Sequence, residues 1–120
     1  MARILVAEDD ADIARLIEFQ LKVSGFEVTL ATDGAEAVEK VKASPPDLIL
    51  IDWMMPVMDG LTALTHLKSD PATERIPVIL MTAKAQTADI RTGMDAGAAA
   101  YLVKPFPLEQ LISTIQGVMA

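Results

Sequence analysis

The sequence has no cysteine among its 120 residues, which excludes disulfides, thiolate nucleophiles and thiolate metal sites. It also lacks a surplus of basic residues: the formal net charge is −7, which opposes direct binding to nucleic acids or anionic membranes. No apolar stretch approaches the roughly 20 residues that span a bilayer. The first apolar run, residues 4–7, is too short for a signal peptide and is followed by three acids. We therefore expect a soluble, cytoplasmic protein.

Hydrophobic residues make up 52% of the chain, which is enough to bury one core. No linker, repeat or low-complexity tract interrupts the sequence. We therefore expect residues 1–120 to form a single domain. If these residues act alone, their output must be contact with another protein.

Five short apolar runs alternate with longer amphipathic segments. Three of the runs are continuously apolar, which is typical of strands buried on both faces of a parallel sheet. The runs are residues 4–7, 28–31, 48–51, 78–81 and 101–103. Five strand–helix units in one chain predict an α/β fold with a parallel sheet and helices on both faces.

Helical spacing predicts a helix after each apolar run. Gly25 stands where the first predicted helix ends, and Pro107 at the first position of the last one. Two further helices are predicted over residues 35–43 and 61–67. Gly93 interrupts the remaining one, around residues 87–96.

Polar side chains follow four of the five predicted strands. They are Glu8, Asp9 and Asp10 after the first strand, Asp52 after the third, Thr82 after the fourth and Lys104 after the fifth. Each has an ordinary explanation alone, as a helix cap, a strand-end hydroxyl or a solvated lysine. Because parallel strands end at one edge of a sheet, we expect these complementary groups to converge where open α/β sheets bind ligands.

The chemistry of this set favours phosphoryl transfer. Oxygen ligands without histidine or cysteine indicate Mg²⁺ or Ca²⁺, and the spaced acidic loop of a calcium-binding EF-hand is missing. An aspartate such as Asp52 can act as a nucleophile and form an acyl phosphate. Mg²⁺ and Lys104 would then neutralise the phosphoryl oxygens.

Four motifs carry these residues: ILVAEDD, DLILIDWMMPVMDG, PVILMTA and YLVKPF. In all four, over essentially its whole length, the chain resembles the receiver domain of two-component response regulators, the CheY-like family. The resemblance implies a doubly wound, flavodoxin-like sheet with strand order 2-1-3-4-5. It also implies that Asp52 is the phosphoacceptor. Mg²⁺ would be bound by Asp9, Asp52 and the backbone carbonyl of Met54, with Glu8 acting mainly through water.

The resemblance assigns the remaining polar residues as well. Thr82 would hydrogen-bond the phosphoryl group, and Lys104 would form a salt bridge to it. Tyr101 would be an aromatic switch that turns inward when Thr82 moves; without that role it would be a half-buried strand tyrosine with its hydroxyl in water. Asp10 lies one place beyond the family's acidic pair, so we expect it to cap a helix. The Lys104–Pro105 bond would be cis, and the only histidine, His66, would lie on the surface of the third helix.

The implied partners are a sensor histidine kinase or a histidine phosphotransfer protein as donor, and a downstream protein target. Members of the family signal through the fourth helix, fifth strand and fifth helix, where residues 98–120 carry only Lys104 and Glu109 as charged groups. Charge depletion is typical of interface cores, although a plain solvated helix is an alternative. We expect no salt-bridged dimer there, and any phosphorylation-dependent self-association should depend weakly on salt.

Three other functions compete with this interpretation. An aspartate-nucleophile phosphatase or phosphotransferase would need a second acid two places after the nucleophile, where Met54 stands. A nucleotide- or flavin-binding module would need a glycine-rich phosphate loop, and neither G-x-x-x-x-G-K-[ST] nor G-x-G-x-x-G occurs. A degenerate receiver that serves only as a scaffold would not retain Asp9, Asp52, Thr82 and Lys104 together.

Overall fold

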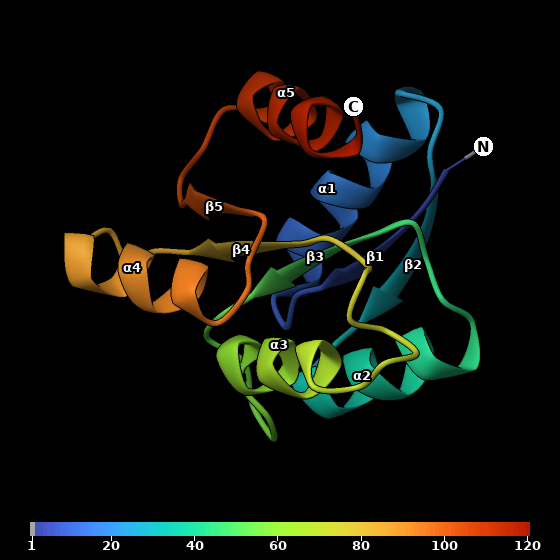
Figure 1. The fold of residues 1–120 in the computed structure, drawn as a ribbon. Coiled ribbons are helices and arrows are strands. Elements are labelled where there is room, and N and C mark those ends of the chain that lie inside the picture. The colour runs from blue at the N-terminus through green and yellow to red at the C-terminus, as the bar shows by residue number, and fades with distance from the viewer. Residues whose placement is uncertain (1) are drawn as a thin grey trace.

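The computed structural model describes residues 2–120, in which five parallel strands alternate with five helices (Figure 1). The strands are β1 (Arg3–Ala7), β2 (Glu27–Ala31), β3 (Leu48–Asp52), β4 (Val78–Thr82) and β5 (Ala100–Val103). The helices are α1 (Ala11–Val23), α2 (Gly34–Ala43), α3 (Gly60–Lys68), α4 (Thr87–Asp95) and α5 (Leu108–Met119). The sheet order is β2-β1-β3-β4-β5, which confirms the predicted doubly wound topology.

The central strands are the most apolar because helices cover both of their faces. Every residue of β3 and β4 is buried, whereas exposure alternates along the edge strand β2. The register brings the strand ends level: Ala7 pairs with Ala31 on one side and Ile51 on the other, and Asp52 pairs with Met81. The polar residues that follow these strands therefore meet at one edge of the sheet.

Two helical layers enclose the sheet (Figure 1). Helices α1 and α5 pack on one face, and α2, α3 and α4 on the other. Alternate residues of β1 serve the two cores: Ile4 and Val6 face α1, whereas Leu5 and Ala7 face α2. Among residues 2–120, no helix is long and apolar enough to cross a bilayer.

The structure refines three predictions about helix boundaries. Helix α4 runs unbroken through Gly93, where a Cβ atom would lie 2.8 Å from Leu80 Cδ1 and 3.1 Å from the ring of Tyr101, so the glycine allows close packing. Pro107 was expected inside α5 but precedes it, because its ψ of 144° is extended. Gly25 follows α1, as predicted, and its φ of 96° is the left-handed conformation common at helix ends.

Aspartates cap the first three helices, all at the edge where the strands end. Asp10 Oδ1 accepts hydrogen bonds from the backbone N–H groups of Asp12 (3.0 Å) and Ile13 (3.2 Å), which confirms its expected role as a cap. Asp33 and Asp59 cap α2 and α3 with one such bond each, from the N–H groups of Glu36 and Thr62. The acids that follow the strands thus have two separate roles, and Asp10 has the structural one.

Replacing Asp10 with alanine should lower the free energy of unfolding by about 1 kcal/mol, because two helix N–H groups lose their acceptor. Asp10→Asn keeps an acceptor oxygen and should unfold nearly as the wild type does. Urea unfolding in EDTA measures both. If Asp10→Asn lost Mg²⁺ binding, Asp10 would belong to the metal site and the cap assignment would be incomplete.

Candidate functional site

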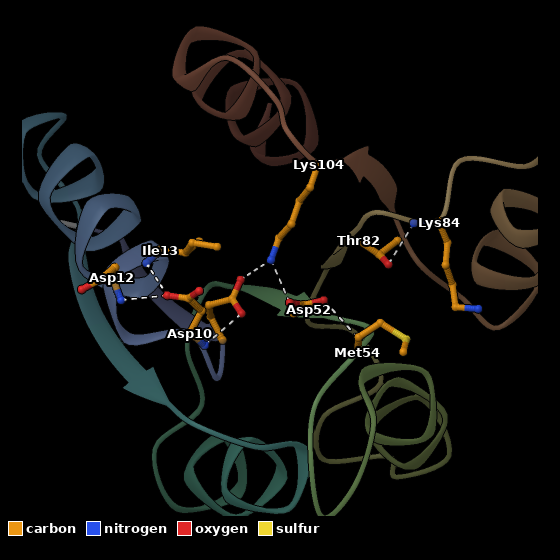
Figure 2. A network of polar contacts seen from close by, with 9 residues as sticks. Asp10, Asp12, Ile13, Asp52, Met54, Thr82, Lys84 and Lys104 are labelled. Carbon is orange, nitrogen blue, oxygen red and sulfur yellow. Dashed lines mark hydrogen bonds and ion pairs between the residues drawn. The ribbon is translucent and has the colours of Figure 1, made fainter.

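The polar residues converge at the carboxyl ends of the strands (Figure 2). Asp52 is the last residue of β3, Glu8 follows β1, and Lys104 follows β5. The two acids are almost fully buried, with exposed fractions of 2% for Glu8 and 6% for Asp52. Ionised carboxylates are rarely buried without partners, so this edge of the sheet requires a compensating charge.

That compensating charge is the ammonium group of Lys104, which reaches from the end of β5 toward Asp52 (Figure 2). Its Nζ donates to Asp52 Oδ2 at 2.8 Å and also to Glu8 Oε1. One ammonium therefore serves two carboxylates, and the three groups retain one net negative charge when all are ionised. The site is consequently receptive to a further cation.

Burial makes Glu8 easy to protonate in spite of the nearby ammonium. Burial raises the pKa of Glu8 to about 7; the hydrogen bond from Lys104 opposes this rise without cancelling it, and nearby Asp52 adds to it. Burial alone would lower the pKa of Lys104, but its bonds to Asp52 and Glu8 outweigh burial and raise it. Lys104 thus stays charged at neutral pH, where Glu8 titrates.

Three carboxylates lie close enough together that they could hold a metal ion. Oxygen atoms of Glu8, Asp9 and Asp52 all lie within 4.8 Å of one another, and Asp9 is exposed while the other two are buried. A hard, oxygen-only set of this kind fits Mg²⁺, which binds through one or two carboxylates and keeps several waters. Asp9 is exposed, so water can reach this side of the cluster.

The loop between β3 and α3 brings backbone groups to the same site. The N–H of Met54 donates to Asp52 Oδ1 at 3.0 Å, while its side chain is 59% exposed. Farther along, Val57 has a φ of 67°, and the N–H of Met58 donates to the carbonyl of Pro56 at 2.7 Å. A β-branched residue in this tight turn costs about 1–3 kcal/mol, so the loop needs outside support.

Lys84 connects the buried hydroxyl of Thr82 with Tyr101. Its N–H donates to Thr82 Oγ1 at 3.2 Å, and its carbonyl accepts from the Tyr101 hydroxyl at 2.8 Å. Its Nζ lies 5.0 Å from the ring centre of Trp53, which makes an edge-to-face contact with Tyr101 at 6.4 Å. We did not anticipate these contacts, although Lys84 lies only two residues beyond Thr82.

The structure brings together most of the predicted site residues. Glu8, Asp9, Asp52 and Lys104 cluster tightly, and the backbone of Met54 joins them. Thr82 ends the adjacent strand β4, whereas Tyr101 is half-buried and contacts Lys84, so its role as a switch stays a prediction. The Lys104–Pro105 bond is cis and His66 is exposed on α3, as predicted.

Comparison with known proteins agrees with this geometry. Residues 4–116 match the family model of the response regulator receiver domain. The chain is 40% identical over 117 residues to the phosphate regulon transcriptional regulatory protein PhoB of Escherichia coli, covering 98% of this chain and 51% of that protein. It is 39% identical over 117 residues to the transcriptional regulatory protein PrrA of Mycobacterium tuberculosis, covering 98% and 49%. The chain thus spans about half the length of these curated relatives.

Solved structures show the same fold. The receiver domain of Francisella response regulator 1452 superposes with a TM-score of 0.94 at 34% identity, covering 99% of this chain and 97% of that one. The chemotaxis response regulator CheY4 of Vibrio cholerae gives a TM-score of 0.93 at 32% identity, covering 98% of both chains. Both superpositions cover nearly the whole of this chain.

Glu8 should make the metal-free protein less stable as pH rises. The pKa of Glu8 is about 7 in the folded protein and has its ordinary value of 4.5 in the unfolded chain, so the folded protein holds the Glu8 proton more tightly. The stability that this proton contributes is therefore lost as the pH rises from about 4.5 to about 7. Glu8→Gln cannot titrate, and its stability advantage over the wild type should grow through that window, on the order of 1–3 kcal/mol. Urea unfolding in EDTA from pH 5 to 8 measures the difference. A difference that does not vary with pH would contradict the raised pKa.

Proposed function

Because this chain belongs to the response regulator receiver domain family, we propose that Asp52 accepts a phosphoryl group from the phosphohistidine of a sensor histidine kinase or a histidine phosphotransfer protein. A receiver domain is the phosphoacceptor of two-component signalling and is not a conventional enzyme, since it acts only on itself. One observation carries the assignment: the buried Asp52 carboxylate contacts Lys104 and lies close to two further acids at the carboxyl ends of the strands. Residues 1–120 would form this single domain.

The covalent step requires little rearrangement of the chain. An oxygen of Asp52 attacks phosphorus, a P–O bond forms, and the P–N bond to the donor imidazole breaks with its electron pair returning to nitrogen. Lys104 already contacts Asp52 Oδ2 and would move from the carboxylates to the phosphoryl oxygens. The Thr82 hydroxyl would donate to another of these oxygens. The Met54 N–H holds Asp52 Oδ1 and so orients the nucleophile.

Asp9, Asp52 and the Met54 carbonyl would hold Mg²⁺, with Glu8 acting mainly through water. When bound, the ion supplies positive charge to the phosphoryl oxygens. The clustered carboxylates support this assignment, because like charges in a buried site are unfavourable until a cation binds. A lower pKa of Glu8 in the bound state follows from the same argument.

The output would be a change on the surface formed by α4, β5 and α5. Three exposed residues of α5 are uncharged: Gln110, and also Ser113 and Gln116, which border Gln20 of α1. A helix with so little charge suits a protein partner better than a nucleic acid or a membrane. Thr82 and Tyr101 would pass the change to this surface, and both contact Lys84. We propose that the domain acts in the cytoplasm, where its phosphodonor would be found.

Incubation with Mg²⁺ and acetyl phosphate should add one phosphoryl group to the wild-type protein. Asp52→Asn is nearly isosteric but cannot form the acyl phosphate, so it should gain none, and EDTA should abolish the gain in the wild type. Intact-protein mass spectrometry measures both results. Asp10→Asn is the matched control and should label as the wild type does. Labelling of Asp52→Asn to the same extent would show that another residue is the acceptor.

Beryllofluoride, a mimic of the phosphoryl group, should change amide exchange well beyond the site. Altered protection is expected across residues 84–116, because Thr82 and Tyr101 both contact the backbone of Lys84. Asp52→Asn should show no such change under the same conditions. If protection changes only in the loops around Asp52, the proposed output surface is wrong.

A further inference from the structure

The loop that carries Met54 is held from outside by the first residue of α2. The N–H of Gly34 donates to the carbonyl of Met58 at 3.0 Å, and Gly34 is buried in this contact. The first N–H groups of a helix have no partner within the helix, and they lie at its positive end. The start of α2 therefore binds a carbonyl of the loop between β3 and α3, 24 residues farther along the chain.

Only glycine fits at this point of contact. A Cβ atom at position 34 would lie 2.1 Å from the Met58 carbonyl oxygen and 2.9 Å from the Met58 carbonyl carbon. Both neighbours are backbone atoms, so either the loop or the helix would have to shift. Gly34 does not have a positive φ. Its lack of a side chain thus serves the approach of the two backbones and not an unusual backbone conformation.

A second backbone hydrogen bond joins the two ends of the loop. The N–H of Gly60 donates to the carbonyl of Trp53 at 2.8 Å, and a Cβ atom there would lie 2.2 Å from the carbonyl oxygen of Asp52. Val57, which has the strained φ, lies between Trp53 and Met58, the two loop residues whose carbonyls accept these bonds. Such a turn persists only where its surroundings fix it, and Met58, the residue that Gly34 holds, closes it.

We propose that Gly34 is a positioning residue for the metal site. By holding the Met58 carbonyl, it keeps the turn at Val57 closed and fixes the backbone of Met54 beside Asp52. The inference rests on the proposed function, in which the Met54 carbonyl is a ligand of Mg²⁺. Gly34 does not contact the metal, Asp52 or the phosphoryl group, and it acts only through the loop.

The test is Mg²⁺ affinity measured separately from stability. In Gly34→Ala the dissociation constant for Mg²⁺ should rise about tenfold or more, as for other residues that position metal ligands. Trp53 fluorescence and the Mg²⁺-dependent rise in the unfolding midpoint give two readings of that constant. Val41→Ala is the matched control, because Val41 is fully buried in the same helix, and its loss should lower stability but change the constant less than twofold. Gly117→Ala, where a Cβ atom meets nothing within 4 Å, controls for glycine replacement itself.

Amide exchange of the metal-free protein supplies a reading that needs no metal. The amides of residues 53–60 should exchange faster in Gly34→Ala than in Val41→Ala. Each variant is measured equally far below its own unfolding midpoint, so that a difference in global stability does not explain the result. If Gly34→Ala does not fold, the wild type supplies the test: because coupling between two sites is reciprocal, Mg²⁺ should slow exchange of the Gly34 amide, which donates to Met58, more than exchange of the Val41 amide in the same helix.

The outcomes separate this inference from the proposed function. Unchanged Mg²⁺ affinity in a folded Gly34→Ala, or exchange of the wild-type Gly34 amide that Mg²⁺ does not slow, overturns the positioning role alone. An equal loss of affinity in Val41→Ala also overturns it, because general destabilisation would then explain the effect. A wild-type protein without any Mg²⁺ response would overturn the proposed metal site itself.

Discussion

The ammonium group of Lys104, shared between two buried carboxylates, is the interaction on which this edge of the sheet depends. Glu8 and Asp52 come from neighbouring strands and are almost completely removed from water, so without Lys104 they would face each other as uncompensated charges. The cost of burying unpaired charge is several kcal/mol per ion, far above the value of an exposed ion pair. Because one ammonium cannot neutralise two carboxylates, the site keeps an excess of negative charge even in its paired state. Asp9 at the open side increases that excess, and this is the property that a divalent cation would satisfy.

The backbone also keeps these repelling acids together. Hydrogen bonds between main-chain groups tie each loop at this edge to its neighbour: Glu8 N–H to Ala31 O, Gly34 N–H to Met58 O, Trp53 N–H to Met81 O and Lys104 N–H to Thr82 O. Their lengths lie between 2.8 and 3.0 Å. Aspartate caps then fix the starts of α1, α2 and α3. The positions of the charged groups are therefore set by the sheet and its loops. The side chains have little freedom to retreat into water, and the strain at Val57 is kept by the same frame.

Much of this arrangement was predictable from local patterns. Continuous apolar runs indicated buried parallel strands, and acids after those strands indicated a site, because both features depend only on nearby residues. The strand order came from the family resemblance, since alternation of strands and helices permits several orders. The features that escaped prediction depend on contacts between distant segments. Gly34 looks like an ordinary helix start in the sequence, and nothing near it indicates the loop carbonyl 24 positions later. Gly93 was expected to interrupt its helix because glycine destabilises helices. The close contacts with Leu80 and Tyr101 that explain this glycine exist only in the folded protein.

Lys84 shows how a covalent event at Asp52 would reach β5. A hydroxyl can accept and donate at once, so Thr82 can keep the N–H of Lys84 while donating its own proton to a phosphoryl oxygen. Movement of Thr82 would therefore pull the backbone of Lys84 and not release it. The next carbonyl along that backbone holds the Tyr101 hydroxyl, so the displacement would pass directly to β5. The ammonium of Lys84 lies against Trp53, the neighbour of Asp52, through a cation–π contact of about 0.5–1 kcal/mol. New negative charge on Asp52 would compete with that weak contact, and the main chain and the side chain of one residue would then respond together.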